Sequence, residues 1–92
     1  MIEVRQTREF VGWLHHLRDA NAVARIRRME MGNPGDTRSV GQGILENAHR
    51  LWAGYRIYYL RHGAQIVILL CGGNKRTQQK DILRAQKLAE TL

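Results

Sequence analysis

The sequence predicts an α+β fold, in which an N-terminal strand and a helical hairpin pack on a curled antiparallel sheet with a C-terminal helix. Three observations support this fold class. Apolar residues recur at helical spacing in the first third of the chain, alternate in the middle and return to helical spacing at the end. Breaker clusters rich in glycine separate these zones. Helices that precede and follow a run of strands are typical of domains whose helices cover one face of a sheet.

The N-terminal third predicts one strand and two helices. Residues 1–6 alternate loosely and predict a short strand. Thr7 is a suitable N-cap for a first helix, and Asp19 for a second. The apolar residues at helical spacing are Phe10, Trp13, Leu14 and Leu17 in the first helix and Val23, Ile26 and Met29 in the second. The second helix ends at the breakers 32–36, and the tight link between the two helices predicts an antiparallel hairpin.

The rest of the chain predicts four strands and a last helix. The strand candidates are residues 37–40, 44–51, 55–61 and 64–71, with turns at 41–43, 53–54 and 62–63. Residues 64–71 are almost uniformly apolar, which predicts a fully buried central strand. Residues 72–78 predict a loop that leaves this strand. The last helix begins at Thr77 or Gln78, and its apolar stripe is Ile82, Leu83, Leu88 and Leu92.

The composition limits the classes of protein to which this chain can belong. A length of 92 residues predicts a single domain over 1–92, and 43% hydrophobic residues exclude a disordered chain. The net charge of +7 predicts an anionic partner such as nucleic acid, an acidic protein or a lipid surface. The longest apolar run, 66–71, is too short to span a membrane, and the N-terminus has no signal-like pattern. The single cysteine, Cys71, fits a reducing compartment, so we expect a soluble cytoplasmic protein.

A long segment without acidic residues is the most informative feature for function. No Asp or Glu occurs between Asn47 and Lys80. The basic residues in this segment are Arg50, Arg56, Arg61, Lys75, Arg76 and Lys80. A sheet of one charge sign attracts the phosphate backbone of a nucleic acid, so we expect RNA or DNA as the partner.

The other chemical groups narrow the chemistry. The four histidines and one cysteine lack metal-ligand spacing, and the glycines of 72–77 lack the Walker spacing, so no metal or cofactor is expected. His49 lies in the basic segment and can titrate near neutral pH. Tyr55, Tyr58 and Tyr59 invite base stacking, but alternation places apolar residues on both faces of their strand, which assigns at least some of these rings to the core. Arginine, lysine, histidine and tyrosine then remain for catalysis, and this set suits phosphate chemistry.

Several short motifs follow one another in a fixed order. They are Phe10…Trp13-Leu14…Leu17, Ala24-Arg25-Ile26, Gly32-Asn33…Gly35-Asp36, Val40-Gly41-Gln42-Gly43, Gly54-Tyr55-Arg56-Ile57-Tyr58-Tyr59 and the run from Leu69 to Ile82. Together they resemble the RelE/HigB-like toxins of bacterial toxin–antitoxin modules, in particular the "addiction module killer protein" branch of the RelE/ParE superfamily. The resemblance extends over nearly the whole chain.

The resemblance implies a compact microbial RNase-like fold and ribosome-dependent cleavage of mRNA. In such mRNA interferases the 2′-hydroxyl of the message attacks the adjacent phosphate, and basic residues activate the hydroxyl, stabilise the transition state and assist departure of the 5′-oxygen. The resemblance also implies a cognate antitoxin, usually a helix-turn-helix DNA-binding protein. The partners are then the antitoxin, the ribosome and mRNA, without a membrane or a cofactor.

The resemblance also assigns roles to residues. Arg56 matches the arginine near the scissile phosphate, and Lys75 and Arg76 match the basic loop. Gln78, Lys80 and Asp81 match the Thr-Gln-x-Lys-Asp signature of the branch, in which Asp81 is expected to cap or pair structurally. The candidate catalytic residues are Arg56, Lys75, Arg76 and His49, and the candidate nucleic-acid-binding residues are Arg50, Lys80, Gln78 and Arg61.

One departure from the branch leaves alternatives open. Ala48 stands where the branch has an arginine, and Ile82 where some RelE toxins have a tyrosine. Arg50 lies two residues further on the same strand face, whereas His49 would act from the opposite face. The alternatives to an mRNA endonuclease are a ParE-like toxin that inhibits DNA gyrase and a catalytically disabled RNA-binding relative.

Overall fold

The computed structural model describes residues 3–18, 20, 23–24, 37–48, 54–63 and 65–92. Its elements are β1 (Glu3–Gln6), α1 (Arg8–His16), β2 (Thr37–Ser39), β3 (Ile44–Ala48), β4 (Tyr55–His62), β5 (Ile66–Asn74), a 3₁₀ turn η2 (Lys75–Thr77) and α3 (Gln78–Glu90). The predicted second helix, and with it the helical hairpin, lies largely outside the described residues, and the breakers at 32–36 lie outside them entirely.

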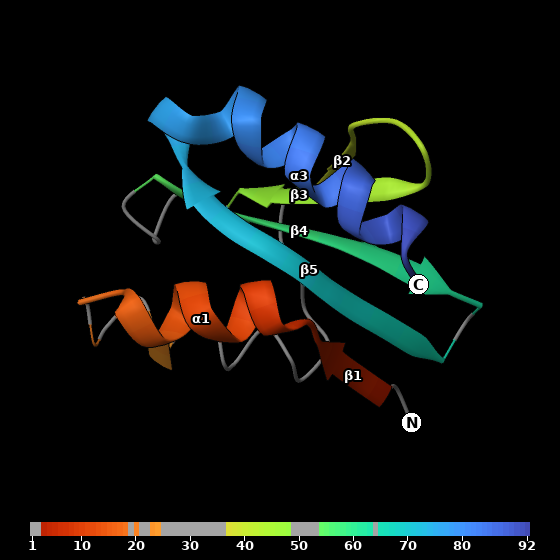
Figure 1. The fold of residues 1–92 in the computed structure, drawn as a ribbon, viewed down its shortest axis with the longest axis horizontal. Helices are drawn as coiled ribbons and strands as arrows, with labels where there is room; N and C mark the ends of the chain where they lie inside the picture. The colour runs from red at the N-terminus through yellow and green to blue at the C-terminus, as the bar shows by residue number, and fades with distance from the viewer. Residues whose placement is uncertain (1–2, 19, 21–22, 25–36, 49–53, 64) are drawn as a thin grey trace.

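The strands form one five-stranded sheet in the order β1-β5-β4-β3-β2 (Figure 1). The pairs β2–β3, β3–β4 and β4–β5 are antiparallel, as predicted, whereas β1 runs parallel to β5. The sheet is therefore mixed, and the α+β class predicted from the sequence is confirmed. The predicted turn at residue 62 begins one residue later, because His62 still pairs with Ile66 and Gly63 takes the positive φ of 69°.

Helices cover both faces of the sheet, so the prediction that they share one face is wrong. Phe10 and Leu14 of α1 pack against Ile57, Tyr59 and Leu69 on one face. On the other face Ala85 of α3 packs in a second cluster, whose further buried members are Ile44, Tyr58, Leu70 and Cys71. Figure 1 shows α3 above the sheet and α1 below it. The physical reason is β5 itself, because an interior strand that is apolar on both sides needs a cover on both sides.

Strand β5 extends three residues beyond its predicted end, so residues 72–74 are strand and not loop. A Cβ atom on Gly72 would lie 2.4 Å from the Trp13 ring of α1. A Cβ on Gly73 would lie 1.7 Å from Oδ2 of Asp81 in α3. The two glycines therefore let α1 and α3 approach the end of β5 from opposite faces, and they do not mark a turn.

Both described helices begin near the end of a strand. Thr7 caps α1 as predicted, because its hydroxyl accepts a hydrogen bond from the Phe10 N–H at 3.1 Å and donates one to the Leu70 carbonyl oxygen. In α3 the residues fully buried against the sheet are small or polar, Asp81 and Ala85. Leu83 and Leu92 are 66% and 65% exposed, so their predicted place in the apolar stripe is wrong. Among the described residues, no helix is long and apolar enough to cross a membrane.

Candidate nucleic-acid-binding site

Arg56 lies on β4 at the end of the sheet where η2 begins. Its register partners are Ala48 on β3 and Gly73 on β5, so it faces the α3 side. The side chain is 18% exposed, and its Nε atom is buried. Its Nη1 donates a long hydrogen bond of 3.4 Å to the Gly54 carbonyl oxygen, and its Nε lies 3.8 Å from Oε1 of Glu46. Among the described residues, Arg56 is therefore oriented by Gly54 and Glu46.

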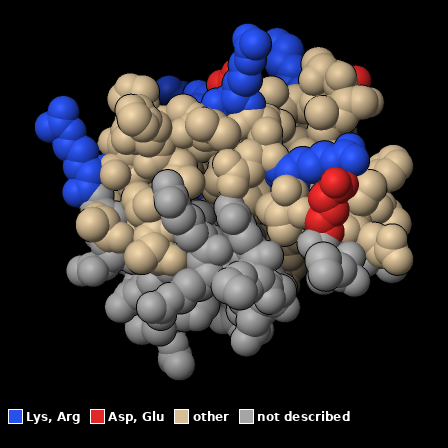
Figure 2. All heavy atoms as spheres, turned by 90° about the horizontal axis from the view of Figure 1, so that it is seen from below, with Lys and Arg blue, Asp and Glu red and all other residues tan. Residues whose placement is uncertain are grey.

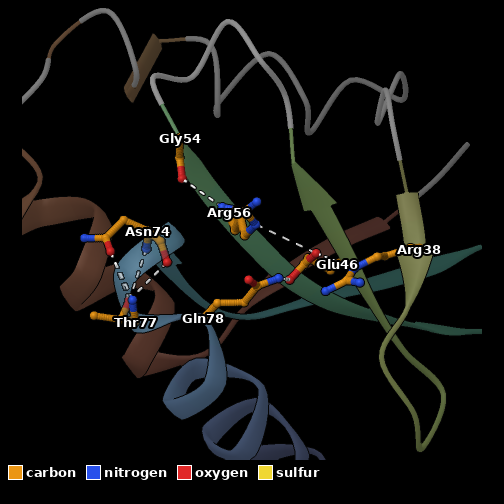
Figure 3. Close-up of polar contacts among 7 residues, drawn as sticks. All are labelled: Arg38, Glu46, Gly54, Arg56, Asn74, Thr77 and Gln78. Atoms are coloured by element: carbon orange, nitrogen blue, oxygen red, sulfur yellow. Dashed lines mark hydrogen bonds and ion pairs between the residues drawn. The ribbon is translucent and has the colours of Figure 1, made fainter.

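Glu46 on β3 is the centre of a polar network on this face (Figure 3). Its carboxylate is only 3% exposed. Oε1 accepts a hydrogen bond of 2.7 Å from Nε of Arg38 on β2, and Oε2 accepts one of 2.9 Å from Nε2 of Gln78 on α3. Together with the ion pair to Arg56, these contacts connect three strands and a helix through one carboxylate.

The carboxylate of Glu46 is ionised at neutral pH. Burial by itself raises its pKa, but the hydrogen bonds from Arg38 and Gln78 outweigh burial, so that the pKa lies below its usual value. The same pair raises the pKa of Arg38. Across the strand, burial and the negative charge of Glu46 raise the pKa of the Tyr58 hydroxyl. Tyr58 is therefore a neutral core residue and not a general base.

The loop after β5 is held in a fixed conformation. The Asn74 side chain accepts hydrogen bonds from the backbone N–H groups of Arg76 at 2.8 Å and Thr77 at 3.1 Å. The Thr77 hydroxyl accepts one from the Asn74 N–H at 3.2 Å and donates one to the buried Asp81 carboxylate, which confirms a structural role for Asp81. Lys75 and Arg76 lie on this loop with exposed side chains. Because Asn74 takes up the N–H groups of Arg76 and Thr77, the exposed side chains of Lys75 and Arg76 are the cationic groups that this turn offers to an anion.

The structure brings four of the predicted site residues to one end of the sheet. Gln78 and Arg56 share Glu46, and Lys75 and Arg76 occupy the turn between Gly73, the register partner of Arg56, and Gln78. Lys80 is exposed in the first turn of α3, two residues after Gln78, whereas Arg61 is exposed near the opposite end of β4. His49 and Arg50 lie outside the described residues.

The prediction that at least some of the three tyrosine rings belong to the core is confirmed for two of them. Tyr58 and Tyr59 are 0% and 4% exposed and belong to the two cores, as alternation along β4 indicated. Tyr55 is partly buried and meets Trp13 edge to face at a centroid distance of 6.2 Å. Burial raises the pKa of Cys71 to about 12, so its thiol is inert. In the part of the chain that the structure describes, no group of histidine, cysteine and acidic residues could hold a metal ion.

The charged side chains that the structure describes as exposed within 47–80 are all basic. The segment 47–80 has no acidic residue, but the two acids that flank it, Glu46 and Asp81, both fold into the site. Figure 2, seen from the α1 side of the sheet, shows the described Lys and Arg side chains of that side apart from one another, one of them beside an acidic side chain. Sequence reasoning missed Arg38 and Glu46. The available signal was alternation in β3, which places Glu46 on the same face as the core residue Ile44.

Comparison with solved structures identifies the fold. A chain of the crystal structure of the toxin–antitoxin complex RelBE2 from Mycobacterium tuberculosis matches with a TM-score of 0.66. The match covers 80% of this chain and 98% of that chain at 17% sequence identity. The chain therefore has the fold found in that complex, an α+β architecture with a five-stranded mixed sheet.

The family is shown by sequence. An uncharacterized protein of Haemophilus influenzae is 43% identical over 95 residues, which cover 99% of this chain and 96% of that protein. The chain belongs to the same family as that protein. No family model matches the sequence.

Proposed function

We propose that this chain is the toxin of a bacterial toxin–antitoxin module, of the HigB-like branch of the RelE family, and that it cleaves mRNA on the ribosome in the cytoplasm. The fold shared with a chain of the RelBE2 complex and the motif resemblance over nearly the whole chain support this function. One observation carries this proposal: the mostly buried Arg56 lies at the end of the sheet beside the turn that holds Lys75 and Arg76.

The proposed reaction is transfer of a phosphoryl group within the message. The 2′-hydroxyl gives its proton to a base, its oxygen forms a bond to the adjacent phosphorus, the bond to the 5′-oxygen breaks, and the leaving oxygen takes a proton from an acid. Arg56 stabilises the additional negative charge of the five-coordinate transition state, because its planar donors are already fixed by Glu46 and Gly54. Lys75 and Arg76 neutralise flanking phosphates, and the ribosome positions the RNA.

The proton carriers in this proposal are His49 and Lys80. The other three histidines belong to the described residues, and all three lie far from Arg56 in space. His15 and His16 are on α1, which covers the opposite face. His62 is at the far end of β4, six residues and roughly 20 Å from Arg56.

A second candidate is a basic RNA-binding relative that does not cleave. The register favours it, because Ala48 lies directly opposite Arg56 at the position where the resemblance implies an arginine. With one strand arginine fewer, the site could bind a phosphate and still stabilise the transition state too weakly for turnover.

The proposed antitoxin partner is a helix-turn-helix protein that covers the cationic end of the sheet with acidic residues. We expect the complex to weaken as salt rises, because opposite charges at a wet interface are screened. Isothermal titration of the purified pair between low and high salt measures this. An affinity that stays constant across the titration would place the antitoxin on an apolar surface elsewhere.

The function is tested by inducible expression in bacteria, with primer extension on a translated message. The wild-type chain is expected to arrest growth and to cut messages in frame, and Arg56→Ala is expected to do neither. Arg5→Ala is the matched control, since Arg5 is an exposed strand arginine paired with Glu3. Arrest with intact messages would indicate a gyrase-inhibiting, ParE-like toxin, and no arrest would support the non-cleaving relative.

A further inference from the structure

We propose that Arg38 is a positioning residue for Arg56 and acts through Glu46. Arg38 and Gln78 each donate a hydrogen bond to one oxygen of the Glu46 carboxylate. Glu46 therefore orients Arg56 without neutralising its charge. This inference deepens the proposed function and rests on the role of Arg56 in binding an RNA phosphate. Arg38 itself stays outside the binding site.

The distances separate two kinds of contact at Glu46. Each carboxylate oxygen has one short donor: Oε1 has Nε of Arg38 at 2.7 Å, and Oε2 has Nε2 of Gln78 at 2.9 Å. Nε of Arg56 lies 3.8 Å from Oε1, which is beyond hydrogen-bond distance. Arg56 is thus close enough to be oriented by the charge of Glu46 but is not bonded to it.

The exposures of the two arginines support this division. Arg38 is 61% exposed, so water surrounds most of its guanidinium while it neutralises Glu46. Arg56 is 18% exposed, and its charge lies in a less polar environment, where it attracts an anion more strongly. One carboxylate between two arginines leaves a net charge of +1, and the geometry assigns that charge to Arg56.

The sheet keeps Arg38 away from a ligand of Arg56. Arg38 is on the edge strand β2 and Arg56 is on β4, with β3 between them. Two strand spacings separate their backbones by roughly 10 Å. In the register Arg38 pairs with Glu46, whereas Arg56 pairs with Ala48, one row further along the same face. Glu46 contacts both arginines, so it is the described group through which Arg38 acts on Arg56.

Removal of Arg38 changes the partner of Glu46. A buried carboxylate that loses its charged donor is costly to leave unpaired, and the other cation in an ion pair with Glu46 among the described residues is Arg56, about 1 Å beyond bonding distance. Arg56 then bonds to Glu46, its charge is neutralised and its donors turn away from the ligand. The Arg38→Gln substitution therefore weakens ligand binding only while Glu46 carries its negative charge.

The test is a double-mutant cycle on the purified chain with a labelled 2′-O-methyl RNA tetranucleotide, which binds like RNA but lacks the attacking hydroxyl. Fluorescence anisotropy is expected to show about tenfold weaker binding for Arg38→Gln, the equivalent of one charged hydrogen bond lost to the ligand. Arg38→Gln combined with Glu46→Gln is expected to bind more tightly than Arg38→Gln and more weakly than wild type, because Arg56 then keeps its charge but loses the carboxylate that orients it. If Arg38 acted only by stabilising the fold, removing the charge of Glu46 would not restore ligand binding.

The controls keep the outcomes separate. Arg5→Gln, an exposed arginine in another ion pair, is expected to bind as wild type, and thermal unfolding confirms that each variant is folded. Unchanged binding in Arg38→Gln, a double variant no better than Arg38→Gln, or no binding by the wild type would each overturn the inference. If the cycle behaves as expected but the wild type cuts no message in cells, the proposed cleavage fails and the inference stands.

Discussion

The two faces of the sheet are built from the same five strands but differ in chemistry. Beneath α1 the contacts are aromatic and aliphatic, with Phe10, Tyr59 and Leu69 in one cluster. Beneath α3 the contacts are apolar only around residues such as Ile44 and Leu70, and toward η2 they give way to the Glu46 network. The candidate site therefore lies where the core of the α3 face ends and charged groups begin.

This difference separates packing from electrostatics within one small chain. On the α1 face a substitution changes how closely apolar groups fit. At the η2 end of the α3 face a substitution leaves a buried charge without a partner. The following predictions compare these two kinds of loss, in order of decreasing size.

The largest effect on stability is expected at Glu46. Glu46→Ala leaves the Arg56 Nε, which is buried, without its counter-charge and removes the acceptor of Arg38 and Gln78. We expect a loss of about 2–3 kcal/mol in the free energy of unfolding, measured with urea. Glu3→Ala is the control, because its pair with Arg5 is more than half exposed and should contribute less than about 0.5 kcal/mol. Equal losses in both variants would show that the buried network does not stabilise this face.

A smaller effect is expected on the α1 face. Gly72→Ala places a methyl group 2.4 Å from a ring carbon of Trp13, which is held between Phe10 and Tyr55 and cannot move freely. We expect a loss of about 2 kcal/mol in urea unfolding. Gly12→Ala is the matched control, since its Cβ would meet no atom within 4 Å and alanine favours the helix, stabilising the chain by about 0.5–1 kcal/mol. A neutral Gly72→Ala would mean that Trp13 does not pack on β5 as described.

The pH dependence of stability should come from the α3 face. The pKa of Glu46 is lowered in the folded state, so its stabilisation is complete above the ordinary carboxylate range near pH 4 and is lost as the pH falls through the lower, folded value. Urea unfolding between pH 6 and pH 3 should show the wild type losing stability that Glu46→Gln does not lose. Parallel curves for the two proteins would contradict the assigned direction of the pKa shift.

The smallest effect on stability is expected at the η2 turn, where the side chains face solvent. Lys75→Gln combined with Arg76→Gln should change the free energy of unfolding by less than about 0.5 kcal/mol. The same change should reduce the slope of log affinity against log salt for single-stranded RNA by about 0.7 for each charge. A slope that does not change would remove both residues from the RNA surface.

The comparison also explains what the sequence could predict. Alternation along β4 predicts apolar residues on both faces of the strand, and Tyr58 and Tyr59 do lie in the two opposite clusters; Thr7 is the N-cap that the sequence predicts. These features depend on residues that are neighbours along the chain, where periodicity and capping rules apply.

The features that were mispredicted depend on contacts between residues that are far apart in the sequence. In the sequence, the pair Gly72-Gly73 predicts a turn. The structure shows instead that Trp13 and Asp81 lie against these glycines from opposite sides. The fully buried positions of α3 are likewise Asp81 and Ala85, at a helix face that lies close to β5, and apolar periodicity alone favours the larger residues of the helix instead. The Glu46 network requires the register of three strands and the position of α3, which no single segment carries.

The most direct test of the central claim is cleavage of a defined message by the purified chain, with and without stalled ribosomes. The account predicts that wild type cuts only the ribosome-bound message, that Arg56→Ala does not cut it, and that a 2′-deoxy substitution next to the scissile phosphate prevents cleavage. Arg5→Ala should cut like wild type. Full activity of Arg56→Ala, or cleavage that survives the 2′-deoxy substitution, would contradict the account.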